Sequence, residues 1–426
     1  MNNSASAVDS EGANPPLPFK SCACVSKYVF HLHTVGFSRH HLANSFYQGA
    51  SMTTQPLQIG VIGAGAIASS VHLPILKRRS DLFNVVSLAD FNIAAVNVLA
   101  DRFGIEHRYE SAIDLIGAGN IDAVAILNSG SHAEYVIQAL RAGLDVFCEK
   151  PLAYSHNEMD RIEAELKSSG KRLMIGYMKT FDPAVLAAAE NISGRPRTVD
   201  VLVLHPSGHS QLATTDLSVD IPAAPASLVE SYKRDSFELQ VKALGEAAAK
   251  SFGNFYMDVI LGSVIHEFSV LRSLDVHITE IDFVDRWPAV GMTESIMIHG
   301  RTADGVRVTI RWFYLDKYPA YQEEVRWVNE NQGHHIIFAS PYILRVPTTY
   351  TYTKRVGLDR EESTRLSYVA SFENELEAFH ELTVSGKQQT DPILAGREDL
   401  IISQQVAVKI AQREGTQLGG DLTEYL

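Results

Sequence analysis

Between residues 57 and 176, short apolar runs alternate with segments of helical periodicity, and this alternation limits the fold more than any other feature of the chain. Such alternation is typical of a parallel sheet whose crossover helices cover its faces. The predicted strands are Gln58–Gly63, Asn84–Ala89, Ala123–Leu127, Asp145–Cys148 and Arg172–Ile175. The predicted helices between them include Ala94–Phe103, Ala133–Ala142 and Asn157–Ser168. We therefore predict an α/β fold that begins with a doubly wound parallel sheet.

From about residue 198 the apolar residues follow a period of two, which indicates strands with one solvated face and a large open, mainly antiparallel sheet. These strands are predicted at Thr198–Leu204, Ile278–Val284, Glu294–His299, Val306–Phe313, Glu323–Val328 and His334–Phe338. Helices are predicted at Ser236–Lys250, Asp258–Leu274, Tyr368–Ser385 and Ile393–Arg413. The segment Leu204–Ser227, with His205, His209 and Asp216, is predicted to be a loop over a cleft.

Composition excludes several classes of protein. The chain has 426 residues, with 37 Lys and Arg against 50 Asp and Glu, so its formal charge of −13 disfavours a non-specific nucleic-acid binder. No uncharged apolar stretch is long enough to predict a transmembrane helix. Three cysteines cannot form a disulfide framework, which fits a reducing compartment. We expect a cytoplasmic protein of several domains.

Residues 1–51 differ from the rest because they show no apolar periodicity. Cys22 and Cys24 are followed by His31 and His33, but this spacing matches none of the usual zinc arrangements, so we predict no metal site. We expect a disordered or non-native extension that plays no part in the chemistry. The predicted domains are residues 52–178 and 179–426.

A glycine-rich loop follows the first predicted strand directly. Its sequence, Gly63-Ala64-Gly65-Ala66-Ile67-Ala68, fits G-x-G-x-x-A. In that pattern the first glycine permits a tight turn, and the second lets a pyrophosphate approach the backbone at a helix N-terminus. The loop therefore predicts a dinucleotide site of the Rossmann type at Gly63, Gly65, Ala66 and Ile67.

Asp90 ends the second predicted strand, 22 residues beyond Ala68. A carboxylate at this place accepts hydrogen bonds from the adenosine ribose and repels a 2′-phosphate. The alternative is a plain strand–turn–helix unit with a capping aspartate. Phe91 and Asn92 follow, without an arginine to bind a phosphate, so we predict NAD rather than NADP.

Glu149-Lys150-Pro151 ends another predicted strand, and ligands of open α/β sheets bind beyond such strand ends. Lys150 could donate to an oxygen on which negative charge develops during a reaction. The alternative is a surface salt bridge made by Glu149. His266, in an apolar helical segment, could take a hydroxyl proton near neutral pH, although a lone histidine in such a helix is more often structural.

These motifs together resemble the glucose–fructose oxidoreductase / inositol dehydrogenase / MocA (Gfo/Idh/MocA) family. The residues that carry the resemblance are the glycine loop with His72-Leu73-Pro74, the helix Ser131–Gly143, the segment Asp145–Ala153 (DVFCEKPLA), the segment Gly176–Pro183 and His266. The resemblance extends from about residue 57 to about residue 413 and is strongest up to residue 183. It implies a Rossmann domain, then an α/β domain whose open sheet lines the substrate cleft and often forms an oligomer interface.

The resemblance also implies roles for individual residues. Lys150 would polarise the reacting oxygen, and His266 would be the acid/base group. The other implied positions are Asn128, Ser129, His132 and Glu149 near the nicotinamide half of the cofactor, and Tyr177 and Lys179 toward the substrate.

The sequence departs from the family pattern at two positions. Many members carry an aspartate four residues before the histidine, where this chain has Gly262, and an arginine where it has Thr180. Asp258, two helical turns before His266, could lie on the same face.

The implied activity is NAD(P)-dependent oxidation of a secondary hydroxyl of a sugar, sugar derivative or cyclitol to a ketone, or the reverse. One alternative is a catalytically silent dinucleotide-binding sensor, and another is a redox relay with a tightly held nicotinamide. The expected assembly is a homodimer or homotetramer through the C-terminal sheet.

Overall fold

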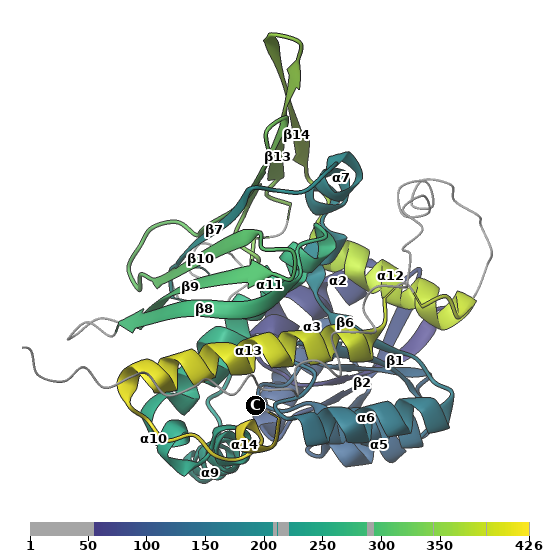
Figure 1. The fold of residues 1–426 in the computed structure, drawn as a ribbon. Helices are drawn as coiled ribbons and strands as arrows, with labels where there is room; N and C mark the ends of the chain where they lie inside the picture. The colour runs from purple at the N-terminus through teal and green to yellow at the C-terminus, as the bar shows by residue number, and fades with distance from the viewer. Residues whose placement is uncertain are drawn as a thin grey trace, which may run out of the picture.

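The computed structural model describes residues 55–207, 211, 221–287, 294–343, 345–388 and 390–425. The expected extension at residues 1–51, together with His209 and Asp216, lies outside these described residues. The described chain forms two sheets, each with its own helices, and the long helix α13 (Pro392–Glu414) passes between them (Figure 1). No helix of the described parts is both long and apolar enough to cross a membrane.

The first sheet has six parallel strands in the order β3-β2-β1-β4-β5-β6, which confirms the predicted doubly wound sheet. The strands are β1 (Leu57–Ile62), β2 (Phe83–Ala89), β3 (His107–Tyr109), β4 (Ala123–Ile126), β5 (Asp145–Glu149) and β6 (Leu173–Gly176). Strands β4, β5 and β6 are buried throughout, because helices cover both faces of the sheet. Strand β3 was not predicted, since its three residues are polar or aromatic and largely exposed.

Helices of the first domain begin and end at residues that suit those positions. They are η1 (Ala68–His72), α2 (Leu73–Arg78), α3 (Ile93–Phe103), α4 (Ala112–Gly117), α5 (Ala133–Arg141) and α6 (His156–Ser169). The side chains of Ser111 and Ser155 cap α4 and α6, and Gly104 and Gly170 end α3 and α6 in the left-handed conformation. The strand order reverses between β1 and β4, so a crevice opens beyond their carboxyl ends.

The second sheet has eight strands in the order β14-β13-β12-β11-β7-β10-β9-β8, and every pairing is antiparallel except that of β7 with β10. The strands are β7 (Thr198–His205), β8 (Ile278–Trp287), β9 (Ser295–Thr302), β10 (Arg307–Tyr314), β11 (Gln322–Val328), β12 (Gln332–Phe338), β13 (Thr348–Val356) and β14 (Asp359–Ser367). The prediction of an open, mainly antiparallel sheet is confirmed. The hairpin β13–β14, which projects from the body in Figure 1, was missed because β14 is polar and exposed along almost its whole length.

The remaining helices differ from prediction in two places. They are η2 (Met178–Phe181), α7 (Pro183–Asn191), α9 (Ala226–Leu244), α10 (Glu246–Phe255), η3 (Tyr256–Val264), α11 (Ile265–Ser273), α12 (Ser371–Ser385) and α14 (Leu422–Tyr425). The single helix expected at Ser236–Lys250 is wrong: the chain breaks at Gly245, whose φ of 84° favours glycine. The helix expected at Asp258–Leu274 has π-helical form through Val264 before it continues as α11.

The C-terminal helices tie the two sheets together. Helix α13 contacts both α6 and β8. Helix α12 returns to the first domain, where Phe372, Leu376 and Phe379 share a core cluster with residues of β1 and α3. These contacts fix the second sheet over the crevice of the first.

Candidate active site

The glycine loop has the space that a pyrophosphate needs. Gly63 has a φ of 108°, and a Cβ there would lie 2.6 Å from the backbone nitrogen of Asn128, so this position requires glycine. Nothing lies within 4 Å of the place that a Cβ on Gly65 would take. Gly65 and Ala66 are exposed at the start of the following helix, with Ile67 beside them. The backbone therefore fits a bound dinucleotide phosphate.

The Asp90 carboxylate joins the end of β2 to the glycine loop. One oxygen accepts a hydrogen bond from the Ala64 N–H at 2.8 Å, and the other accepts one from the Asn92 N–H at 2.8 Å. The carboxylate thus fixes the turn after β2 against the glycine loop and does not cap α3, whose N-cap residue is Asn92. Each carboxylate oxygen has a further lone pair for a ribose hydroxyl.

The loop after β4 offers an unpaired acceptor. The Asn128 side-chain nitrogen donates to the Ser129 carbonyl at 2.9 Å, but its side-chain oxygen is buried without a partner in the described structure. Such an orphaned acceptor is costly unless a ligand or water donates to it. His132 lies behind this loop, with its ring nitrogens 2.6 Å from the Pro151 oxygen and 2.8 Å from the Asn128 oxygen. It holds the loop after β4 against the loop after β5.

A buried hydrogen bond between His72 and Glu149 supports the end of β5. His72, in η1, donates from Nε2 to Glu149 Oε1 at 3.0 Å. Burial alone would raise the pKa of Glu149, but the hydrogen bond and charge of His72 lower it, so this carboxyl is ionised. The pair connects the helix after the glycine loop to the strand that carries Lys150. The motif residue His72 was not predicted as a site residue.

Lys150 reaches across to the second domain. Its Nζ donates to the Gly262 carbonyl oxygen at 2.6 Å. Burial lowers the pKa of Lys150 and the charge of Lys179 lowers it further, whereas Glu149 opposes the shift. At position 262, where many family members carry an aspartate, this chain therefore offers Lys150 a backbone carbonyl.

His266 lies in the first turn of α11, directly after η3. Its Nδ1 is buried without a hydrogen-bond partner in the described structure. Burial, together with the charges of Lys150 and Lys179, holds the pKa of His266 well below its usual value. The ring is therefore neutral at physiological pH and able to accept a proton.

Asp258 does not take the place of the missing aspartate. Asp258 is exposed. Its charge raises the pKa of Tyr154 and that of Tyr232, but it is not among the causes that shift the pKa of His266. Because η3 is π-helical, it does not present its residues with the α-helical spacing that placed Asp258 and His266 on one face.

A buried charged cluster lies beside His266. The Lys179 ammonium donates to Glu323 at 2.6 Å and to Glu267 at 3.2 Å, and the Tyr321 hydroxyl also donates to Glu323. Burial and the neighbouring Glu323 carboxyl raise the pKa of Glu267 well above its usual value. Burial would lower the pKa of Lys179, but the two carboxyls raise it. The predicted residue Lys179 is thus a fixed cation between two carboxyl groups.

Sequence reasoning missed both carboxyl groups, although one signal for Glu323 was present. Every second residue of β11 faces the core, and these buried residues are Glu323, Val325 and Trp327. The charged residue Glu323 therefore lies on the buried face of the strand. A charge at such a position requires a buried partner. Glu267 gave no comparable signal, because its neighbour His266 was the residue expected to act.

Tyr177 contacts Asp399 and Arg272 rather than the charged cluster around Lys179. Its hydroxyl donates to Asp399, which accepts a hydrogen bond from Arg272 at 2.6 Å, and the Arg272 guanidinium lies 5.3 Å from the centre of the Tyr177 ring. Burial and the Asp399 charge raise the pKa of this hydroxyl well above its usual value. These contacts join β6 to α11 and α13, so Tyr177 positions the elements that carry His266.

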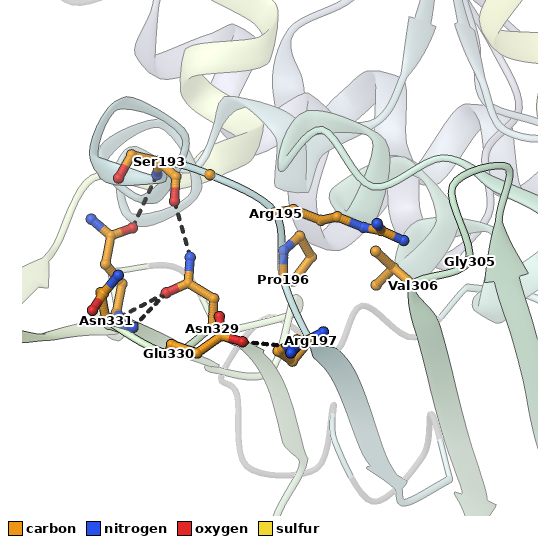
Figure 2. A pocket seen from close by; sticks show the side chains of 11 residues that line it. Ser193, Arg195, Pro196, Arg197, Gly305, Val306, Asn329, Glu330 and Asn331 are labelled. Carbon is orange, nitrogen blue, oxygen red and sulfur yellow. Dashed lines mark hydrogen bonds and ion pairs between the residues drawn. The ribbon is translucent and has the colours of Figure 1, made fainter.

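A surface pocket of about 510 Å³ lies at the start of β7, at the end of this strand opposite His205. Figure 2 shows the side chains that line it, among them Arg195 and Arg197. Arg195 is paired with Asp304 at 2.8 Å, and Arg197 is paired with Glu330. Both arginines are exposed and neutralised, and none of the predicted site residues lines this pocket.

Residues 57–177 match the model of the family described as "Oxidoreductase family, NAD-binding Rossmann fold". Residues 57–177 are thus similar to the NAD-binding domain of the Gfo/Idh/MocA oxidoreductase family. An inositol 2-dehydrogenase of Acidothermus cellulolyticus is 33% identical over 176 residues, which cover 39% of this chain and 51% of that protein. An inositol 2-dehydrogenase of Ralstonia nicotianae is 35% identical over 139 residues, 32% of this chain and 41% of that protein. The chain spans about half the length of the curated relatives it matches.

Several solved structures share the fold over most of the chain. The UDP-N-acetylglucosamine 3-dehydrogenase GnnA from Acidithiobacillus ferrooxidans aligns with a TM-score of 0.61 at 19% identity, over 84% of this chain and 98% of that one. KijD10, a 3-ketoreductase from Actinomadura kijaniata in complex with NADP and TDP-benzene, aligns with a TM-score of 0.61 at 18% identity, over 83% of this chain and 98% of that one. At these identities the likeness concerns the fold alone.

Proposed function

We propose that this Gfo/Idh/MocA protein is an NAD(P)-dependent oxidoreductase that converts a secondary hydroxyl of a sugar, sugar derivative or cyclitol to a ketone, or catalyses the reverse reaction. One observation carries the proposal. At the carboxyl end of the first sheet, Lys150 donates a hydrogen bond to Gly262, four residues before His266, and its charge lowers the pKa of His266. The names of the inositol 2-dehydrogenase and ketoreductase relatives support the class of substrate.

In this mechanism the protein moves one proton and stabilises one charge. His266, which is neutral, accepts the hydroxyl proton of the substrate. Lys150 donates a hydrogen bond to the same oxygen and stabilises its negative charge. A bound nicotinamide dinucleotide would supply the hydride acceptor.

The proposed cofactor residues lie on the loops after β1, β2 and β4 and at the end of β5. Gly63, Gly65, Ala66 and Ile67 would hold the pyrophosphate and Asp90 the adenosine ribose. Asn128, Ser129, His132, Glu149 and Lys150 would lie on the nicotinamide side, with His132 acting through the loop that it holds.

The proposed substrate side is built from the second domain. Lys179 with its two carboxyl partners forms one wall. His205 forms another, with ring centroids 5.4 Å from Trp312 and 5.9 Å from Tyr314. A few fixed polar groups beside aromatic side chains are typical of small-molecule sites. Tyr177 is not part of this wall in our proposal, because its hydroxyl is bound to Asp399.

The function is tested by incubating the full chain with hexoses, glycosides, anhydrosugars and inositols in the presence of NAD or NADP, and by following the absorbance of the reduced nicotinamide. We expect turnover with at least one neutral polyol. Tight dinucleotide binding without turnover on any of them would instead support the sensor alternative.

Replacing Asp90 with serine and Phe91 with arginine should shift the cofactor preference toward NADP. The double variant removes the carboxylate that repels a 2′-phosphate and adds a cation that can bind it. The ratio of kcat/KM for NAD to that for NADP should fall by about tenfold or more, the effect of one charge-assisted contact. Phe91→Arg alone is the matched control, because it keeps the Asp90 carboxylate. Equal efficiency of the unmodified protein with both cofactors would contradict the role of Asp90.

We further propose a cytoplasmic homodimer or homotetramer that assembles through the second sheet. Phe283 and Ile337 on that sheet are 40% and 36% exposed, and a partner subunit would cover them. Light scattering of the purified chain would contradict this assembly if it gave the mass of a monomer.

A further inference from the structure

A segment of the second half of the chain lies against the loops of the proposed dinucleotide site. Residues 221–232 comprise five residues and the beginning of α9, a helix that Figure 1 shows beside α10. Ile221 packs against the core cluster of the first domain, which includes Ala64 of the glycine loop. The Asn92 side-chain nitrogen donates to the Pro222 carbonyl at 2.7 Å. Because Asn92 follows Asp90 by two residues, the segment is attached at the adenosine end of the crevice.

Tyr232 is the residue of this segment that lies between two cofactor loops. Its ring is stacked on that of Phe91, with centroids 6.3 Å apart and planes 17° from parallel. The same ring lies 3.6 Å from the place that a Cβ on Gly130 would take. Phe91 belongs to the loop after β2 and Gly130 to the loop after β4. These loops flank the glycine loop of β1 in the sheet order.

The two stacked rings are incompletely covered. Phe91 is 45% exposed and Tyr232 is 38% exposed, so no hydrophobic core accounts for their pairing. Exposed aromatic faces beside a ribose-binding carboxylate can stack on a nucleobase, because every base has an apolar π face.

We propose that Tyr232, together with Phe91, binds the adenine of the dinucleotide by stacking, so that α9 of the second half of the chain completes the adenosine end of the cofactor site. This inference rests on the proposed dinucleotide function. It adds a cofactor contact that the family motifs of the first domain do not contain.

The test compares the two halves of the cofactor as separate probes. ADP-ribose carries the adenosine half, and nicotinamide mononucleotide carries the other half. Tyr232→Ala should weaken ADP-ribose binding about tenfold by titration calorimetry, since one base–aromatic stack commonly contributes this much. Binding of nicotinamide mononucleotide should not change. Tyr232→Phe should bind ADP-ribose as the unmodified chain does, because it keeps the ring.

Tyr368→Ala is the matched control, because Tyr368 is a surface tyrosine that is 61% exposed and belongs to neither loop. Thermal unfolding of each variant should match that of the unmodified chain. If the unmodified chain binds ADP-ribose and Tyr232→Ala binds it equally well or more tightly, the adenine contact is overturned while the dinucleotide site stands. If the unmodified chain binds no ADP-ribose, the dinucleotide site is overturned and this contact with it.

Discussion

Replacing Lys150 with methionine should reduce kcat by about two to three orders of magnitude, the usual cost of removing one donor to a developing oxyanion. Methionine keeps most of the length and apolar volume of the side chain but removes the ammonium group. The Gly262 carbonyl would lose its donor. The dissociation constant for the dinucleotide should change little, because the glycine loop and Asp90 are the groups proposed to hold its pyrophosphate and adenosine ribose.

Lys167→Met provides the control for this change. Lys167 is an exposed α6 residue that pairs with Glu163 on the same helix, and its loss should leave kcat unaltered. A Lys150→Met protein that retained its turnover would contradict the proposed role. One that lost turnover and dinucleotide binding together would show that Lys150 acts through cofactor affinity and not on the reacting oxygen.

Replacing His266 with alanine should lower kcat by about 10²–10⁴-fold, the range for loss of a general base. The acidic limb of the pH profile should also change. Because the pKa of His266 is held well below that of a free histidine, its protonation and the resulting loss of activity should begin at a lower pH than for an ordinary histidine. The limb should flatten in His266→Ala.

Gly262→Asp tests the same base from the opposite direction. A carboxylate near His266 would favour the imidazolium, so the pKa of His266 should rise and the acidic limb should move to higher pH. The new Cβ would lie 3.2 Å from the Met257 carbonyl, which is tight, so the melting temperature must be measured alongside. An unchanged pH profile in both variants would show that a group other than His266 accepts the proton.

The first domain could be predicted from sequence because its signals are local. The glycine loop and the apolar run of β1 specify strand, turn and helix within twelve residues, and the G-x-G-x-x-A pattern needs no distant partner. The approach of Lys150 to the segment of His266 was implied only by family resemblance. No periodicity relates residues more than a hundred positions apart on different domains.

The remaining features of the site depend on tertiary contacts. Tyr177 was expected to face substrate, but its hydroxyl is held by Asp399, a residue of the last long helix. The π-helical form of η3 was missed because its apolar sequence fits an α-helix equally well. The contact of Tyr232 with Phe91 was missed because the helix was predicted to begin at Ser236, whereas α9 begins at Ala226 and so includes Tyr232.

The hydrogen bond of Lys150 to a peptide carbonyl affects the local charge around Lys150 and His266, the proposed catalytic residues. A carboxylate at position 262 would cancel the lysine ammonium, whereas a carbonyl presents only a dipole to it. At position 262 only a carbonyl dipole opposes the charge of Lys150, whose pKa burial and the charge of Lys179 lower. A substrate alkoxide formed beside Lys150 would offset positive charge, whereas with a carboxylate at position 262 it would add to negative charge. Glycine at this position thus leaves His266 as a weaker base, but it leaves the Lys150 ammonium better able to stabilise negative charge on a substrate oxygen.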